Sequence, residues 1–401
     1  MANNIFINGG VDNNWSNPAN WSLGLVPTAT DGNTVVFNSS QVTCNVDIVN
    51  AECNGLSINF TVNLSNNNIN VSGSLYCAGT TFGSTTITFV GVCSWSSNGS
   101  VLVNNVIFSS TSNVTVLGVI AFGGVITDLS GGNVNTDLST IVVPFNYTGA
   151  SFNTPLVKWN NIIINVNGAI SLQNDLYLSG DLILAASFNL NSNINNYNIY
   201  VSGSLYCYGV SCGGTTTIHL TGNGVVNVGN VVLSANINFN TNGTYFIYSL
   251  KYTTGIFKIT KGNIKTIPGA ILAVTGSCTF SNISNLVFIN IIITGSITVN
   301  SDSWFSGNAA YFTQITSTTS VNYNVNITKP VVYSKYLKIK NCTAINKNSL
   351  VVINENGNLG SNNNILFGNS TPNGFPSNNF IRLDDMCNFN DKNESTNGFP
   401  L

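Results

Sequence analysis

The chain has 401 residues, of which 6% are charged and 43% are hydrophobic, and its formal net charge at pH 7 is −2. Ordinary domains carry about 25% charged residues, and surface helices are built largely from Glu, Lys, Arg, Ala and Leu, so a mainly helical protein is excluded. The hydrophobic share excludes a disordered chain. No Lys or Arg precedes Lys158, which excludes nucleic acid and anionic membranes as partners.

Asparagine, glycine and β-branched residues take the place of the missing charge. The sequence contains 70 Asn and 37 Gly, which favour turns, together with many Val, Ile and Thr, which favour strands. No run of 18 apolar residues is present, so no membrane insertion is expected. The composition therefore predicts a folded, all-β protein.

The chain begins with a segment that is rich in aromatic residues. Residues 1–40 contain Trp15, Trp21 and Pro27, and we expect them to form a cap or attachment segment that covers the open end of a β-rich body. Residues 1–4 lack the basic and apolar regions of a signal peptide. We therefore expect either that a leader has been removed or that the protein leaves its cell without one, as virion proteins do at lysis.

A repeat dominates the middle of the chain. Residues 71–77, Val-Ser-Gly-Ser-Leu-Tyr-Cys, recur identically at 201–207, within duplicated units near 66–90 and 195–220. Weaker copies of a Gly-Ser-Leu unit follow one another at short intervals, for example from Gly180 to Gly203 and from Gly276 to Gly295. Such an interval matches one turn of a parallel β-solenoid, so we assign residues 41–315 to solenoid repeats.

The scarcity of charge agrees with this fold. In a solenoid each strand pairs with the equivalent strand of the next turn, so identical positions stack above one another. Stacked Asn side chains can hydrogen-bond to each other, whereas stacked Lys or Glu would repel. The alternative is an array of antiparallel β-sandwich modules, whose hairpins also use Asn-Gly turns. The solenoid is favoured because the repeat is short and its turns vary in length.

The nine cysteines and the single histidine do not form a metal-binding pattern. No Cys pair has the Cys-x-x-Cys spacing with partner histidines, and His219 takes the place of Thr88 in the repeat. We expect the thiols to be mostly buried and free, with some disulfides as the alternative. The cysteines are Cys44, Cys53, Cys77, Cys93, Cys207, Cys212, Cys278, Cys342 and Cys387.

The C-terminal part differs from the middle. Residues 316–367 include an alternating run with outward lysines at 331–340, which predicts a small β-rich C-terminal module. Residues 368–401 are rich in Pro, Asn and Asp and carry Asn-Gly-Phe-Pro twice, at 373–376 and 397–400. They are expected to form a loose surface tail.

The N-terminal pattern resembles a known group of proteins. Trp15, the run Asn-Pro-Ala-Asn-Trp-Ser at 17–22, Pro27-Thr28 and Asp31 are similar to the opening of extracellular β-repeat proteins of Bacteroidota. They also resemble fibre- or spike-like virion proteins of phages that infect such bacteria. The resemblance covers roughly residues 10–90 and returns through the repeats to about residue 300. It implies an extracellular structural or adhesive protein and supplies no catalytic residues.

Catalysis is the main rival interpretation, because some β-solenoids cleave sugars. Glycoside hydrolysis needs two carboxyl groups about 5–10 Å apart. Asp175 and Asp181 flank one expected strand, and a straight strand would separate them by about 20 Å. Asp384 and Asp385 form the only acidic doublet, which is typical of a solvated loop. We therefore predict no enzyme, no catalytic residues, no metal and no cofactor.

The sequence thus predicts a non-enzymatic structural protein with a neutral surface. Our first hypothesis is a fibre, spike or decoration subunit of a phage virion, and the alternative is a bacterial cell-surface adhesin or filament subunit. We expect a homo-oligomer, with a trimer favoured, together with other virion or surface proteins and a host glycan as partners. The candidate glycan contacts are Tyr206, Tyr208, Trp304 and Tyr311.

Overall fold

The computed structural model describes the backbone of residues 2–252 with short gaps, and from there the strands between 257 and 368. The gaps are residues 41, 146, 148–149, 167, 186–187, 193–196, 209–210, 215 and 234–235. Side chains are described up to residue 248, with further gaps at 168–169, 188–192, 211–214 and 229–233. Two compact units, Met1–Tyr200 and Val201–Leu401, are described separately below.

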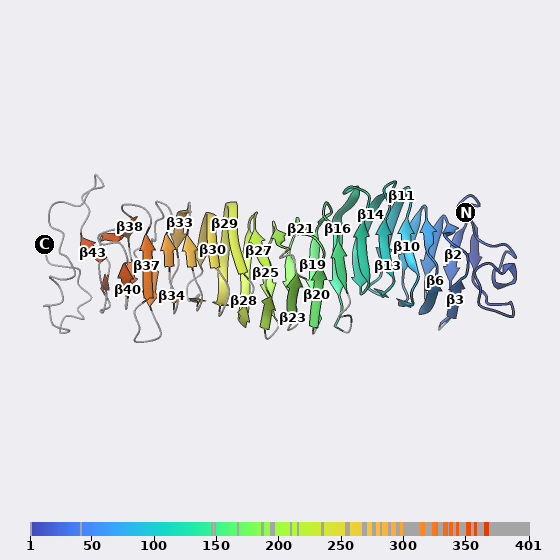
Figure 1. The fold of residues 1–401 in the computed structure, drawn as a ribbon, viewed down its shortest axis with the longest axis horizontal. Coiled ribbons are helices and arrows are strands. Elements are labelled where there is room, and N and C mark those ends of the chain that lie inside the picture. The colour runs from blue at the N-terminus through green and yellow to red at the C-terminus, as the bar shows by residue number, and fades with distance from the viewer. Residues whose placement is uncertain are drawn as a thin grey trace. The chain divides into compact units, whose positions relative to one another are not determined.

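The described elements are strands, apart from one short 3-10 helix, η1 (Pro18–Asn20). All pairings between the named strands whose register is described are parallel. Strands inside the stack, such as β5 and β10, pair with the equivalent strand one turn earlier and one turn later (Figure 1). Parallel pairing excludes the hairpins of a sandwich array. The predicted parallel β-solenoid is therefore confirmed, and the β-sandwich alternative is wrong.

Each coil of the first unit contributes strands to three faces, here named A, B and C. Face A consists of β1 (Asn3–Ile5), β2 (Thr34–Phe37), β5 (Gly55–Ile58), β8 (Ser74–Cys77), β11 (Val92–Ser97), the first halves of β14 (Asn113–Phe122) and β16 (Val134–Val143), β18 (Lys158–Trp159), β21 (Leu176–Leu178) and β24 (Ile199–Val201).

Faces B and C follow in the same order along the chain. Face B consists of β3 (Val42–Val46), β6 (Val62–Asn66), β9 (Thr81–Phe82), β12 (Val101–Leu102), the second halves of β14 and β16, β19 (Asn161–Ile164) and β22 (Leu182–Leu184). Face C consists of β4 (Ala51–Cys53), β7 (Ile69–Val71), β10 (Thr86–Phe89), β13 (Asn105–Phe108), β15 (Val125–Asp128), β17 (Ser151–Asn153), β20 (Gly168–Leu172) and β23 (Phe188–Ser192).

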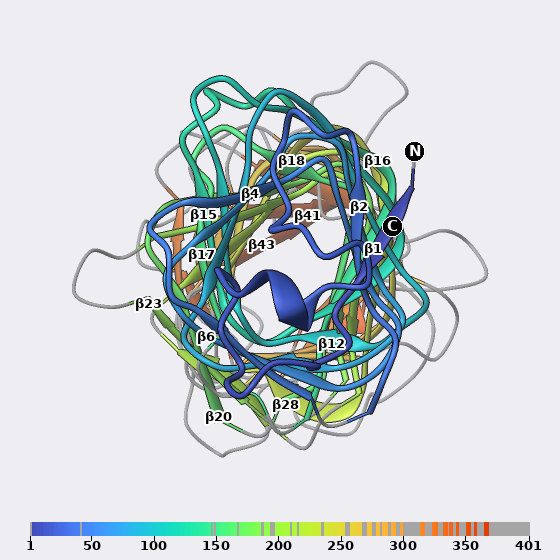
Figure 2. The same ribbon diagram turned by 90° about the vertical axis from the view of Figure 1, so that its right-hand side faces the viewer.

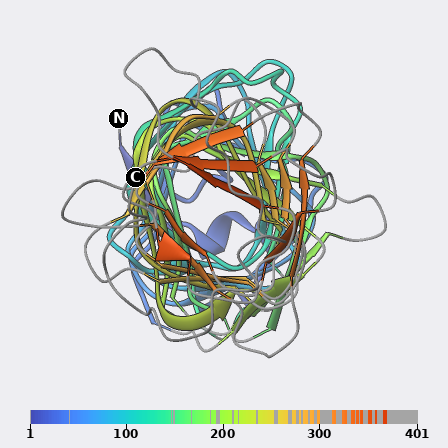
Figure 3. The same ribbon diagram turned by 90° about the vertical axis from the view of Figure 1, so that its left-hand side faces the viewer.

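The second unit again stacks its strands in three parallel columns, which run around a common axis in Figure 3. The first joins β27 (Thr217–Leu220), β29 (Asn236–Tyr252), β30 (Phe257–Thr266), β32 (Cys278–Phe280), β35 (Ile297–Val299), β37 (Tyr323–Ile327) and β40 (Cys342–Ala344). The second joins β25 (Leu205–Cys207), β28 (Gly224–Leu233), β29, β30 and β33 (Ile283–Val287).

The third column joins β26 (Ser211–Gly214), β28, β29, β31 (Ile271–Val274), β34 (Asn290–Ile293), β36 (Thr313–Thr316), β39 (Leu337–Ile339) and β42 (Gly357–Asn358). A separate three-stranded sheet contains β38 (Val332–Lys335), β41 (Leu350–Ile353) and β43 (Ile365–Gly368). Residues 369–401, which make up nearly all of the predicted tail, lie outside the described residues. The predicted boundaries at 40, 315 and 367 stay predictions.

The core of the first unit follows from the alternation of the strands. In β10, Ile87 and Phe89 are fully buried while Thr86 and Thr88 face outward. Aromatic rings from successive coils meet inside: Trp95 lies 6.0 Å from both Phe89 and Phe122, measured between ring centroids. Burial of such side chains supplies the main stabilisation, at about 25 cal/mol per Å² of apolar surface.

Asparagine side chains form ladders between coils, as the sequence predicts. The Asn45 amide nitrogen donates a hydrogen bond to the Asn14 amide oxygen at 2.6 Å, and Asn66 in turn donates to Asn45. Asn59 donates to Asn38 one coil away in the same manner. Each amide is both donor and acceptor, so neighbouring amides satisfy one another along the ladder, which ends where the Asn14 amide nitrogen donates to the Asp12 carboxylate.

The duplicated heptapeptide occupies two different corners of the coil. Residues 71–77 leave face C at the end of β7 and enter face A in β8. The second copy, 201–207, begins at the end of β24, which belongs to face A. Because the same seven residues serve two different corners, the structural repeat is a single strand with its corner and not a whole coil.

Candidate functional site

The N-terminal segment covers the first coil with a cluster of aromatic rings. Trp15 and Trp21 are almost fully buried, and their ring centroids lie 4.8 Å apart in an edge-to-face arrangement. Phe6 lies 5.0 Å from Trp21, and the Trp21 indole nitrogen donates to the carbonyl oxygen of Trp15 at 2.8 Å. Pro27 is also buried. Figure 2 shows η1 lying within the ring of strands at this end, so the predicted cap is confirmed in part.

Asp12 organises the polar side of the cap. Its carboxylate accepts hydrogen bonds from the side-chain amides of Asn14, Asn17 and Asn20, at 3.0 to 3.2 Å, and from the backbone amide of Asn14. The hydrogen bond from the Asn17 side chain, followed by that from the Asn14 backbone, lowers the pKa of Asp12 below its usual value. The four residues therefore hold the cap loop around a single anion.

The cap is joined to the first coil by main-chain and side-chain contacts. Asp47 accepts hydrogen bonds from the backbone and the hydroxyl of Ser16. The backbone amide of Trp15 donates to the carbonyl oxygen of Asn45 at 2.8 Å, and the backbone amide of Asn45 donates back to Asn13. The outer edge of β3 is thereby paired at Asn45, which covers part of a surface that would otherwise recruit another strand.

Two of the four aromatic residues that we predicted to contact glycans have described side chains. Tyr206 and Tyr208 stack with their ring centroids 6.1 Å apart and their planes at 17°, and Tyr208 is 58% exposed. This pair is accessible to a ligand at the Tyr208 end. Trp304 and Tyr311 lie outside the residues whose side chains are described.

A second tyrosine pair was not predicted from the sequence. Tyr177 of β21 and Tyr200 of β24 stack on successive coils, with ring centroids 4.9 Å apart and planes at 9°. Burial, followed by the nearby charge of Asp175, raises the pKa of Tyr200. Because the two rings stack face to face, the facing ring surfaces cover each other and are closed to a ligand. The signal in the sequence is the spacing of the two residues, which is close to one coil.

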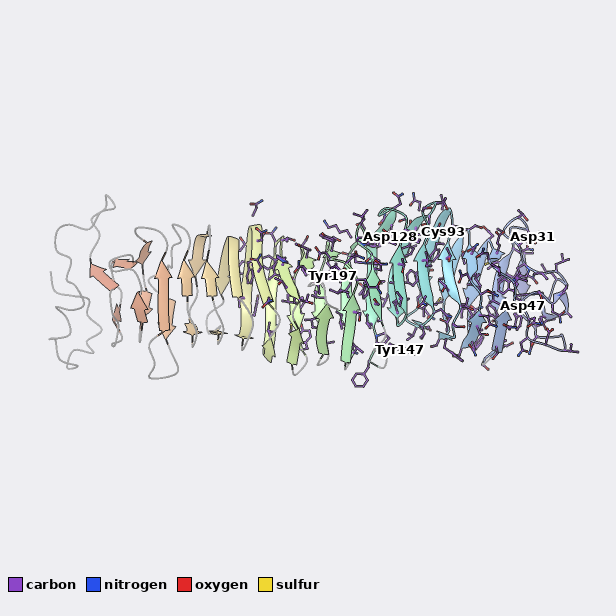
Figure 4. The ribbon with its side chains drawn as sticks, viewed as in Figure 1. Asp31, Asp47, Cys93, Asp128, Tyr147 and Tyr197 are labelled. Carbon is purple, nitrogen blue, oxygen red and sulfur yellow. The ribbon has the colours of Figure 1, made fainter. Side chains whose placement is uncertain are left out.

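The acidic residues of the first unit are dispersed along the coil, and one of them, Asp128, is buried. Asp175 and Asp181 lie in the two corners that flank β21. We expected one straight strand between them, but β21 is shorter and ends at Leu178. Asp175 accepts a hydrogen bond from the backbone amide of Asn198 at 2.8 Å. Asp31, Asp47 and Asp128 are separated from one another in Figure 4.

Among the described residues, no group of three or more His, Cys, Asp or Glu side chains is placed to hold a metal ion. His219 lies in β27 in register with Asn238, and its Nδ1 is 3.1 Å from the Asn238 amide nitrogen, so it occupies a ladder position. Asp384 and Asp385 lie outside the described residues.

The described cysteines are all buried: Cys44, Cys53, Cys77, Cys93 and Cys207. Burial raises the pKa of Cys77 to about 12 and that of Cys93 to about 11, and it raises the pKa of Cys44 and Cys53 further. The thiolate is the nucleophilic form of cysteine, so these side chains act as apolar core residues. For Cys44, Cys53, Cys77 and Cys93 the prediction of buried free thiols is confirmed.

Comparisons with protein-family models, curated proteins and solved structures found no match to this chain. In the described part of the chain, no helix is long and apolar enough to cross a membrane. The function must therefore be argued from the coil itself.

Proposed function

We propose that this chain is a non-enzymatic structural protein: a fibre, spike or decoration subunit of a phage virion that presents a neutral surface for assembly or for adhesion to host glycans. The observation that carries the proposal is the organisation of its described surface. Amide side chains there are aligned in ladders along the coil, for example from Asn66 to Asn45 and from Asn59 to Asn38. The solenoid supports these ladders as a rigid scaffold.

Such a surface is suited to contacts that persist at different salt concentrations. Amide and hydroxyl groups hydrogen-bond to sugars and to peptide groups without the ion screening that weakens charged contacts. The exposed Tyr208 adds an aromatic surface of the kind that stacks on sugar rings. A charged surface of the same shape would attract ions and polyanions non-specifically.

The thiols favour a virion component over a secreted adhesin. Four free cysteines, Cys44, Cys53, Cys77 and Cys93, are buried in the core, and disulfides form readily in the compartments through which adhesins are exported. A chain that folds in the reducing cytoplasm and leaves the cell in an assembled particle avoids mispairing of these thiols. The alternative function, a subunit of a bacterial surface adhesin or filament, requires export before folding.

Localisation tests the first part of the proposal. Antibodies against the purified full-length chain would be used for immunogold labelling of particles released from the source culture and of intact cells. We expect gold on phage particles and the chain among the proteins of purified virions. Labelling of the cell envelope with none on particles would instead support the adhesin.

Incubation with host glycans tests the second part. The full-length protein is mixed with capsule and cell-wall polysaccharides, and reducing ends and unsaturated products are measured over time. We expect binding, seen as co-sedimentation with the polysaccharide, and no new products. Cleavage that disappears in Asp175→Asn or Asp181→Asn, and persists in the matched variant Asp137→Asn, would show that the chain is an enzyme.

A further inference from the structure

Exposed apolar side chains border both edges of face A around β14, β16 and β18. Leu117 and Leu138 are register partners on neighbouring coils and are 36% and 75% exposed, and Val119 beside them is 49% exposed. At the opposite edge, Leu129 and Leu156 lie in the same corner on successive coils and are 58% and 64% exposed. The two rows of leucines therefore leave exposed apolar side chains on both sides of face A, where they are available to an interaction surface.

Two opposite charges lie between these rows. Asp137 of β16 and Lys158 of β18 are both exposed. The Thr136 hydroxyl donates to the carbonyl oxygen of Lys158 at 2.5 Å, which places the two charged residues on adjacent coils. Neither side chain forms an ion pair with another described residue. Lys158 is also the only Lys or Arg among residues 1–250, so face A carries the only cationic side chain of this segment.

We infer that this leucine-bordered part of face A binds a second copy of the chain in a two-fold symmetric dimer. In a two-fold symmetric dimer the same surface of both copies forms the interface. If one residue of the first copy contacts a second residue of the partner, the reverse contact also forms. Asp137 of each copy then pairs with Lys158 of the other, and the leucine rows pack around the two ion pairs. A partner with one sign of charge would leave either Asp137 or Lys158 opposite a like charge.

The patch favours a dimer over the expected trimer. A closed trimer uses two different surfaces of each subunit, whereas both charges and both apolar rows lie here on a single face. The inference goes beyond the proposed function, because the same contact forms whether the chain works on a virion or on a cell.

The experiment is sedimentation velocity on the full-length chain over a range of protein concentrations, with the mass confirmed by light scattering. Wild-type protein is expected to form a dimer. Asp137→Lys and Lys158→Asp should each weaken dimerisation by about tenfold or more, because each sets like charges against one another. The double exchange Asp137→Lys with Lys158→Asp restores two opposite pairs and should recover most of the affinity.

Leu138→Asp tests the apolar rows, and Val49→Asp is its matched control. Val49 is 78% exposed in the corner between β3 and β4, away from face A. We expect Leu138→Asp to give monomers and Val49→Asp to leave the dimer intact, with unchanged circular dichroism in both. A monomeric or trimeric wild type, a dimer that survives Leu138→Asp, or a failure of the double exchange to restore binding would overturn the inference.

Discussion

Single side chains inside this coil lose the chemistry that they would have in water. Cys77 and Cys93 are ordinary thiols in the unfolded chain, but burial raises their pKa values to about 12 and about 11. The cost of burying a thiolate thus removes nucleophilic character from these cysteines. The same environment makes the thiols useful as probes of folding.

We expect the free energy of unfolding to depend on alkaline pH. Below about pH 7.5 the thiols are neutral in both the folded and the unfolded state, so their contribution to stability is complete. As the pH rises through about 8.5 towards 11 and 12, the unfolded chain loses its thiol protons first, and the free energy of unfolding falls. Urea unfolding between pH 7 and 11 measures this. Cys77→Ala with Cys93→Ala should flatten the decline, and an unchanged slope would contradict the expectation.

Within the cap, we expect Trp21 to contribute more to the free energy of unfolding than any other side chain. Trp21→Ala removes its contacts with Phe6, Trp15 and Phe37 and should cost about 3–5 kcal/mol in the free energy of unfolding. Leu25→Ala is the control, because Leu25 is 61% exposed in the same segment and should change stability by less than about 0.5 kcal/mol. Equal effects of the two variants, measured by urea unfolding, would show that the aromatic cluster is not the source of stability.

At the level of elements, adjacent coils are held together by side-chain ladders as well as by the main chain. The backbones of adjacent coils also approach each other closely at some corners. A Cβ atom on Gly79 would lie 2.1 Å from the carbonyl carbon of Phe60 on the preceding coil. Glycine at this corner lets the two coils reach the sheet spacing of about 4.8 Å.

Asn45 tests the ladder. Asn45→Ala removes the hydrogen bonds to Asn14 and from Asn66, and we expect a loss of about 1–2 kcal/mol in the free energy of unfolding. Thr43→Ala, on the same face of β3, provides the control. Circular dichroism during urea titration measures both, and a cost for Thr43→Ala as large as that for Asn45→Ala would assign the effect to strand propensity.

Sequence patterns predict the elements better than the contacts between them. Alternation and missing charge are enough to predict parallel coils, because both follow from stacking like residues above like. Register is different, because coil length varies: Leu56 pairs with Leu75, whereas Val92 pairs with the more distant Asn113. The register also shifts where β14 pairs with β16. Pairs such as Tyr177 with Tyr200 become visible only when every coil length is known.

At the level of the whole molecule, the first unit depends on a covered end. A solenoid is stabilised by contacts between nearest neighbours, so an uncovered first coil exposes both its core and its unpaired strand edges. The cap supplies both kinds of cover, through Trp15 and Trp21 in the core and through the backbone bonds of Asn45 at the edge.

Deletion of residues 1–33, which keeps β2, should therefore make the chain associate end to end. Light scattering at rising protein concentration measures the association, and Asp12→Asn provides a milder variant that keeps the aromatic cluster. A truncated chain that associates no more than the full-length protein would show that the cap is dispensable.

The scarcity of lysine and arginine also affects how readily proteases cleave the chain. A protease of trypsin specificity cuts after these residues, and Lys158 is the only such position in residues 1–250. Its carbonyl group is held by the Thr136 hydroxyl, and its strand pairs with β21. A protease binds its substrate as an unpaired, accessible segment of backbone. This strand stays hydrogen-bonded to its neighbour while the coil is folded, so it is a poor substrate. Digestive proteases of this class should therefore leave the segment 1–250 intact.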